Sequence, residues 1–251
     1  LQAAYGAAGL ERLGPMGPRW FSAEEMAVLA RAMATGLNSP PSSSIGRLFD
    51  ALAALLGLCL INRHEGEAAM ALEAAAWRWH DAHMGRNTGA QGVEDPSAAR
   101  FPGFALRAGA PGEPLEIDWQ PLLDGLLAER DNGIPAEALA HRFHTALAQL
   151  LVELGQWLGT RELLLAGGCF QNRLLLELAT SALERSGITP IRPVRLPCND
   201  GALAVGQLLA IALQRGATVP ANAPGMPRKE PAPSGALHGL GEAPDVSGGA
   251  R

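Results

Sequence analysis

An apolar run that ends in two glycines places the strongest constraint on the fold of this chain. Residues 163–172 read Leu-Leu-Leu-Ala-Gly-Gly-Cys-Phe-Gln-Asn, and a helical pattern follows at once. A buried strand that turns through glycines into a helix can deliver a nucleotide phosphate to free backbone N–H groups at the helix N-terminus. A second turn, Pro197-Cys-Asn-Asp-Gly, opens another apolar helical run. These segments together predict a nucleotide site.

Composition and charge narrow the class of protein. The 251 residues are 47% hydrophobic, which is enough to bury a full core. We find neither an apolar run of membrane-spanning length nor a secretion signal. Basic residues are scattered and the net charge is −5, so we expect no nucleic-acid partner. Three widely spaced cysteines form no CxxC pair and fit a reducing compartment, so we expect a cytoplasmic protein.

Helical spacing dominates the first half of the sequence. Ser22 and Glu25 form a potential capping box, and Gly36 is a suitable C-terminal stop. We expect a helical region over about 20–83, with helices near 22–33, 47–56 and 67–79. Residues 84–114 are rich in Gly, Pro and Asn and predict an irregular excursion.

Strands and helices alternate in the second half, which we expect to form an α/β region over 115–215. The predicted elements, in order, are a strand at 115–119, helices at 120–129 and 135–158, a strand at 162–166, a helix at 170–185, a strand at 188–194 and a helix at 200–214. This order implies a parallel sheet with crossover helices. The composition of residues 216–251, which are dominated by Pro, Ala, Gly and Ser, predicts a disordered tail.

The double glycine and the residues after it are the first candidate site. Gly167 and Gly168 can be a simple tight turn, for which glycine is the permissive residue. Asn172 favours a ligand instead, because on the first turn of the predicted helix its amide would reach a base edge or ribose. Asp200 precedes the next helix, where it is either an N-cap or a metal ligand.

Two further segments are weaker candidates. Asp50 follows the loop glycine Gly46 and either accepts ribose hydroxyl hydrogen bonds or simply pairs with Arg47 three residues earlier. Gly66 lies between two glutamates at a helix start, where acidic residues ordinarily compensate the helix dipole.

Histidines at i,i+3 spacing raise the question of a metal site. His80 and His83 form one such pair, and His141 and His144 form another. Neither pair has a convincing third donor nearby, so we favour boundary residues over metal ligands. No nucleophile is assigned.

Several motifs in order resemble the C-terminal portion of the HypF family, the carbamoyltransferases of [NiFe]-hydrogenase maturation. The motifs are Ser43-Ser-Ile-Gly-Arg-Leu-Phe-Asp50, Glu65-Gly-Glu-Ala-Ala-Met70, Arg142-Phe-His144, Gly167-Gly-Cys-Phe-Gln-Asn172 and Asn199-Asp-Gly-Ala-Leu-Ala-Val-Gly-Gln207.

The resemblance implies that residues 1–215 belong to a TsaD-like transferase domain. The expected fold is the second subdomain of the actin, Hsp70 and sugar-kinase type (ASKHA), with parallel-sheet βα units and a helical insertion. The implied reaction moves a carbamoyl group from carbamoyl adenylate, made upstream from carbamoyl phosphate and ATP, to the C-terminal cysteine of HypE.

Site roles also follow from the resemblance. Gly46, Asp50, Gly66, Gly167, Gly168 and Asn172 would hold ATP or carbamoyl adenylate. Asp200 would bind a divalent metal, Zn or Fe, with two histidines of an upstream HxxxH segment that this sequence lacks. We therefore expect a fragment or split half that is inactive alone. A tRNA threonylcarbamoyl transferase of the TsaD type and a noncatalytic nucleotide-binding scaffold remain the alternatives.

Overall fold

The computed structural model describes residues 1–40, 42–83, 101–110 and 113–216. It divides into two compact units, Leu1–Leu203 and Ala204–Arg251. Every predicted site residue lies in the first unit. In the second unit the described residues form most of helix α9 (Leu203–Gln214) and its C-terminal turn. The predicted tail lies outside the described residues.

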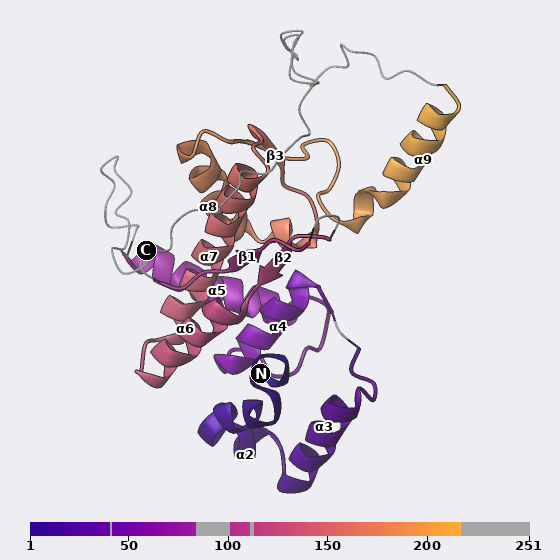
Figure 1. The fold of residues 1–251 in the computed structure, drawn as a ribbon. Helices are drawn as coiled ribbons and strands as arrows, with labels where there is room; N and C mark the ends of the chain where they lie inside the picture. The colour runs from indigo at the N-terminus through magenta and orange to yellow at the C-terminus, as the bar shows by residue number, and fades with distance from the viewer. Residues whose placement is uncertain (41, 84–100, 111–112, 217–251) are drawn as a thin grey trace, which may run out of the picture. The chain divides into compact units, whose positions relative to one another are not determined.

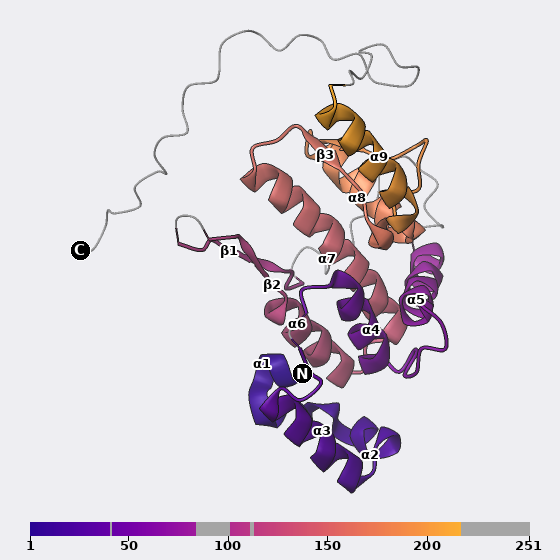
Figure 2. The same cartoon turned by 90° about the vertical axis from the view of Figure 1, so that its right-hand side faces the viewer.

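Helix α7 (Ala136–Trp157) is the centre of the first unit. It packs against α5 (Glu67–His83), α6 (Gln120–Asp131) and α8 (Arg173–Arg185), and α4 (Ile45–Leu55) packs on α5 (Figures 1 and 2). Buried residues recur along α7 at helical spacing, among them Leu139, Phe143, Leu147 and Leu150. Burying one such side chain contributes about 1.5–3 kcal/mol, so this face holds the bundle together.

The N-terminal segment adds short helical pieces to the base of this bundle. These are α1 (Gln2–Tyr5), η1 (Gly6–Gly9), η2 (Glu11–Met16), α2 (Gly17–Trp20) and α3 (Ala23–Thr35). The capping box is confirmed: Ser22 Oγ accepts from the Glu25 amide, and the Glu25 carboxylate accepts from the Ser22 amide. Gly36 ends α3 in the left-handed conformation, as predicted. Helical structure therefore starts before residue 20, where the sequence predicted none. Pieces of four to six residues are too short to show a helical period in the sequence.

Two small sheets accompany the helices. Strands β3 (Glu162–Leu164) and β4 (Thr189–Ile191) pair in parallel, and α8 forms the crossover between them. Leu163, which lies opposite Pro190, and the buried residues Leu165 and Ile188 pack with α7 and α8 side chains in one cluster. The predicted parallel βα unit is therefore present, although both strands are shorter than expected.

Strand β1 (Ala105–Arg107) corrects the prediction that residues 84–114 form only an irregular excursion. It pairs antiparallel with β2 (Glu116–Asp118), and Phe104 beside it is buried. A strand of three residues is too short to show alternating apolar and polar residues in the sequence, so β1 is recognised by its pairing with β2 in the structure. Residues 84–100 of that excursion lie outside the described residues.

The other predicted helices are confirmed with shifts of a few residues at their ends. A membrane-crossing helix is not found among the described residues, since none combines the necessary length and apolar character.

Candidate functional site

The two segments that led the sequence analysis lie next to each other. The Gly167 amide donates to the Cys198 carbonyl at 2.6 Å, and the Leu165 amide donates to the Ile191 carbonyl at 2.8 Å. The parallel pair β3–β4 thus continues into the turns that follow both strands. The turn after β3 and the turn after β4 emerge together at one end of this pair.

The double glycine forms the exposed part of this site. Gly167 has φ of 110°, a conformation that side-chain-bearing residues rarely adopt, and both glycines are exposed. A Cβ added to either glycine would meet no atom within 4 Å, so the space above the turn is open. The 3-10 turn η4 (Gly168–Gln171) follows and leads into α8.

Asn172 lies at the N-cap of α8, one position before the first turn in which the sequence analysis placed it. Its Oδ1 accepts from the Leu175 amide at 2.8 Å, and its Nδ2 donates to His144 Nε2 at 2.8 Å. The side chain is buried rather than presented to solvent. The geometry therefore gives Asn172 a capping contact, and the predicted contact with a base stays a prediction.

His144 is a candidate for the site that residue spacing indicates only as half of a histidine pair and as the end of the Arg142-Phe-His144 motif. It is fully buried on α7, and its Nδ1 donates to the Ala140 carbonyl at 2.7 Å. Burial lowers the pKa of His144 to about 4, although the Ala140 contact opposes this shift. The imidazole is neutral near pH 7, with the proton on Nδ1 and a lone pair on Nε2 that faces Asn172.

The N-terminus of α8 differs from the predicted phosphate site. The amides of Arg173 and Leu174 donate to Glu73 Oε1 at 2.8 and 3.3 Å, and the Leu175 amide donates to Asn172. Glu73 comes from α5, and its carboxylate already compensates the positive end of the helix dipole. The exposed peptides of Gly167 and Gly168, rather than the first turn of α8, are thus the accessible part of the motif.

Asp50 and Gly66 both lie at the connection between α4 and α5, where Asn62 bonds Asp50 and the start of α5. Asp50 pairs with Arg47 at 3.2 Å and accepts from Asn62 Nδ2 at 3.3 Å, and Asn62 Oδ1 accepts from the Ala68 amide at 2.9 Å. Gly66, with φ of 77°, directly precedes α5, and its carbonyl accepts from the Met70 amide in the first turn of that helix. The carboxylate of Asp50 therefore holds the α4–α5 connection, whereas its predicted ribose contact stays untested.

Glu67 supports the same connection. Its carboxylate accepts from the Arg63 backbone amide at 2.5 Å and pairs with the Arg63 guanidinium at 3.0 Å. These hydrogen bonds and the nearby charge lower the pKa of Glu67. Asp50, which follows Gly46, and Glu67, which follows Gly66, thus both have partners within the protein.

Phe49 links the two groups of predicted residues. It precedes Asp50 on α4 and is buried with its ring edge against His144, at 5.6 Å between centroids. His144 in turn contacts Asn172. Asp50 and the double-glycine turn are therefore connected through two buried rings, with no direct contact between them.

The described residues provide no complete set of ligands for the predicted metal. Asp200 is exposed in the 3-10 turn η5 (Asp200–Ala202), and Asn199 rather than Asp200 caps that turn. Among the described residues, no three His, Cys, Asp or Glu side chains gather as a metal site would require. The histidines do not act as i,i+3 pairs either, because His80 contacts His141 across helices at 3.2 Å and His83 bonds the Trp79 carbonyl.

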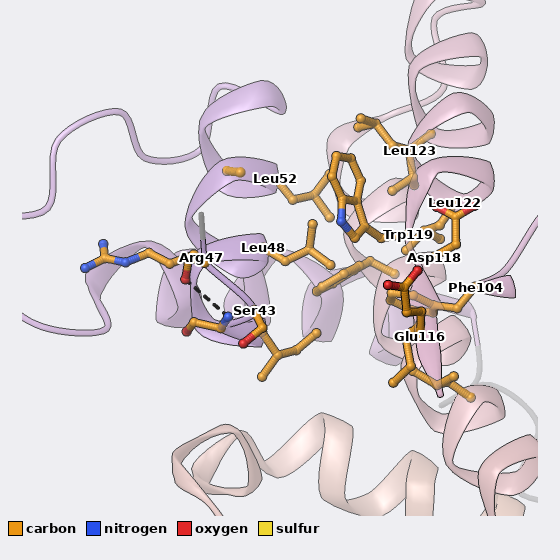
Figure 3. Close-up of a pocket in the computed structure, with 18 of the residues that line it drawn as sticks. Ser43, Arg47, Leu48, Leu52, Phe104, Glu116, Asp118, Trp119, Leu122 and Leu123 are labelled. Atoms are coloured by element: carbon orange, nitrogen blue, oxygen red, sulfur yellow. Dashed lines mark hydrogen bonds between the residues drawn. The ribbon is translucent and has the colours of Figure 1, made fainter. Parts of the chain in front are cut away.

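A cavity of about 780 Å³ lies elsewhere, between α4, α6 and the β1–β2 hairpin. Figure 3 shows Leu48 and Leu52 of α4 facing Trp119, Leu122 and Leu123, with Glu116 and Asp118 of β2 at one side. None of the predicted site residues lines it. The cavity is therefore separate from the double-glycine site.

Sequence comparison identifies the family. A family model described as "Carbamoyltransferase, Kae1-like Domain, second subdomain" matches residues 3–207. The chain belongs to the HypF carbamoyltransferase family. It is 38% identical over 219 residues to carbamoyltransferase HypF of Rhodobacter capsulatus, covering 82% of this chain and 24% of that protein. It is 36% identical over 173 residues to carbamoyltransferase HypF of Synechocystis, covering 69% of this chain and 20% of that protein.

Other HypF proteins extend this similarity. A HypF homolog of Cupriavidus necator is 32% identical over 214 residues, covering 82% of this chain and 50% of the homolog. The crystal structure of full-length HypF in its phosphate- and nucleotide-bound form superimposes with a TM-score of 0.66 at 23% identity, covering 84% of this chain and 26% of that one. The crystal structure of T. kodakarensis HypF superimposes with a TM-score of 0.55 at 25% identity, covering 79% of this chain and 23% of that one. The chain thus corresponds to the C-terminal portion of HypF, with its α/β fold, and spans about a quarter or less of the full-length proteins.

Proposed function

We propose that this chain forms the nucleotide-holding half of a HypF-type carbamoyltransferase domain. In this proposal the complete domain transfers a carbamoyl group from carbamoyl adenylate to the C-terminal cysteine of HypE, toward the cyanide ligands of [NiFe]-hydrogenase. Carbamoyl phosphate and ATP are consumed by the preceding domains of the complete protein, in the cytoplasm. Membership of the HypF family supports this reaction class.

One observation supports the nucleotide role most directly. The exposed Gly167–Gly168 peptides lie in open space, and the Gly167–Cys198 hydrogen bond holds them against the turn that follows β4. Small residues at an exposed turn let a ligand approach the backbone closely. A nucleotide bound here would meet peptide groups and avoid the Glu73 carboxylate at the start of α8.

The remaining predicted residues act around this turn in the proposal. Asn172 and Gly168 bind the nucleotide at the double-glycine turn, whereas Gly46, Asp50 and Gly66 contact it from the α4–α5 side. The ribose would replace Arg47 or Asn62 as partner of Asp50, because both contacts lie at the protein surface and are readily exchanged.

The divalent metal requires donors that the described residues do not provide. Asp200 stands alone as an exposed carboxylate, so these residues do not fit a metal site by themselves. A metal role for Asp200 therefore depends on histidines from outside this chain, and no catalytic step is assigned to the metal here.

Substitution of Gly168 tests the nucleotide role. Gly168 has no positive φ, and an added Cβ would enter open space, so Gly168→Ala leaves the free energy of unfolding nearly unchanged. A methyl group between the backbone and a bound nucleotide weakens ATP binding, by roughly tenfold if about 1.4 kcal/mol of contact is lost. Isothermal titration of the chain with ATP measures this effect.

Gly103→Ala is the matched control, because its Cβ also meets no atom within 4 Å. We expect Gly103→Ala to bind ATP like the unsubstituted chain. Equal ATP affinity in the Gly168→Ala and Gly103→Ala variants would rule out a nucleotide above the double-glycine turn.

A further inference from the structure

His144 is a buried histidine on the helix behind the candidate site, and its role in the reaction is unassigned. It lies on α7, whereas the double glycine and Asn172 lie between β3 and α8. Both ring nitrogens have partners: Nδ1 donates to Ala140 and Nε2 accepts from Asn172. A fully buried polar ring with two satisfied nitrogens specifies one arrangement of its neighbours, since breaking either bond would leave a buried group unpaired.

The hydrogen bonds form a chain with a fixed direction. The Leu175 amide can only donate, so it fixes the Asn172 oxygen as its acceptor and leaves the Asn172 nitrogen to face His144. The Ala140 carbonyl can only accept, so the His144 proton lies on Nδ1. Each member is therefore oriented by the next, from α7 to the first turn of α8.

The surroundings of His144 keep this chain rigid and neutral. The rings of Phe49 from α4 and Phe143 from α7 both meet the imidazole edge to face, at 5.6 and 5.7 Å. No charged side chain contributes to the lowered pKa of His144, which arises from burial. The imidazole is thus an uncharged acceptor in an apolar setting, where a hydrogen bond is strong.

We infer that His144 is a positioning residue: as a neutral acceptor it orients Asn172 and thereby sets the Gly167–Asn172 turn in the shape that receives the nucleotide. This role rests on the proposed function, because it concerns the same turn. Asn172 ends that turn, and the turn is short, with the Asn172 amide bonded to the Cys169 carbonyl and the Phe170 amide to the Gly167 carbonyl. A change in the Asn172 side chain is therefore passed to the two glycines within one helical turn.

A pair of variants of similar shape separates positioning from packing. His144→Gln keeps an acceptor near the Nε2 position, whereas His144→Met has a similar size and no amide. We expect His144→Gln to bind ATP within about threefold of the unsubstituted chain, and His144→Met to bind roughly tenfold more weakly. A role in packing alone predicts equal ATP affinity for the folded forms of the two variants, and urea unfolding of each variant checks that both are folded. His141→Gln, the same substitution on the same helix, is the control and should bind ATP normally.

Nuclear magnetic resonance of the unsubstituted chain tests the same inference without a variant. We expect ¹⁵N resonances of His144 with Nδ1 protonated and Nε2 unprotonated at pH 7. Protonation at Nε2, or equal ATP affinity in the two His144 variants, would overturn the role of His144. Absence of ATP binding in the unsubstituted chain would instead contradict the proposed function, whatever the state of the imidazole.

Discussion

At the scale of single residues, the structure shows that one side chain often meets two requirements. Asn172 caps α8 and also faces His144, although the sequence identified only a possible contact with nucleotide. Asp50 pairs with Arg47, which the spacing allowed, and also with Asn62, which it did not indicate. Local spacing predicts partners within one helix, whereas partners from other parts of the chain depend on packing.

The buried imidazole makes stability depend on pH. The pKa of His144 is about 4 in the folded chain and about 6.5 in the unfolded chain, so the unfolded chain binds the additional proton between these values. The free energy of unfolding therefore falls as pH drops from 6.5 toward 4, by up to about 3 kcal/mol from this group. Urea unfolding at several pH values measures the loss.

Comparison with His144→Met isolates this contribution. We expect that variant to lack the additional slope between pH 6.5 and 4, whereas His141→Gln retains it. The same slope in His144→Met would show that other groups cause the acid sensitivity.

At the scale of elements, the contact between α5 and α8 is the one that most changes the interpretation of the motif. The sequence correctly predicted both helices and the strand–turn–helix order of residues 162–185. It did not show that Glu73 would reach the start of α8, because that contact joins residues 100 positions apart. The proposed contact with nucleotide therefore moves from the helix terminus to the glycine peptides.

Removing the Glu73 carboxylate tests this interhelical cap. Glu73→Ala leaves two amides of α8 without their acceptor, and we expect the free energy of unfolding to fall by about 1–2 kcal/mol. Glu73→Gln keeps an oxygen acceptor and loses only the charge, so its loss should be smaller. Chemical denaturation measures both variants.

Glu177→Ala on the same helix provides the control. Glu177 pairs with Arg173 at the surface, and an exposed i,i+4 pair contributes only about 0.3–0.5 kcal/mol. Losses of equal size at Glu73 and Glu177 would argue against the cap.

At the scale of the whole molecule, much of the architecture follows from short-range pattern. The long period of α7 and the capping box of α3 are visible in sequence because each is complete within one segment. Strand β1, with three residues, is too short to be visible in this way. The candidate site combines residues of α4, α7 and the two turns after β3 and β4, which no single segment of the sequence contains. The functional assignment accordingly depends on the HypF relatives, of which this chain matches only part.

The central claim is that the chain supplies the nucleotide-holding half of a carbamoyltransferase, and a transfer assay tests it most directly. The chain is combined with the preceding portion of the Rhodobacter capsulatus relative, and synthetic carbamoyl adenylate and a HypE C-terminal peptide are supplied. We predict carbamoylation of the terminal cysteine, detected by mass spectrometry, only when both portions are present, with a reduced rate for Gly168→Ala. ATP binding without any transfer to the peptide would contradict the account and favour a noncatalytic scaffold.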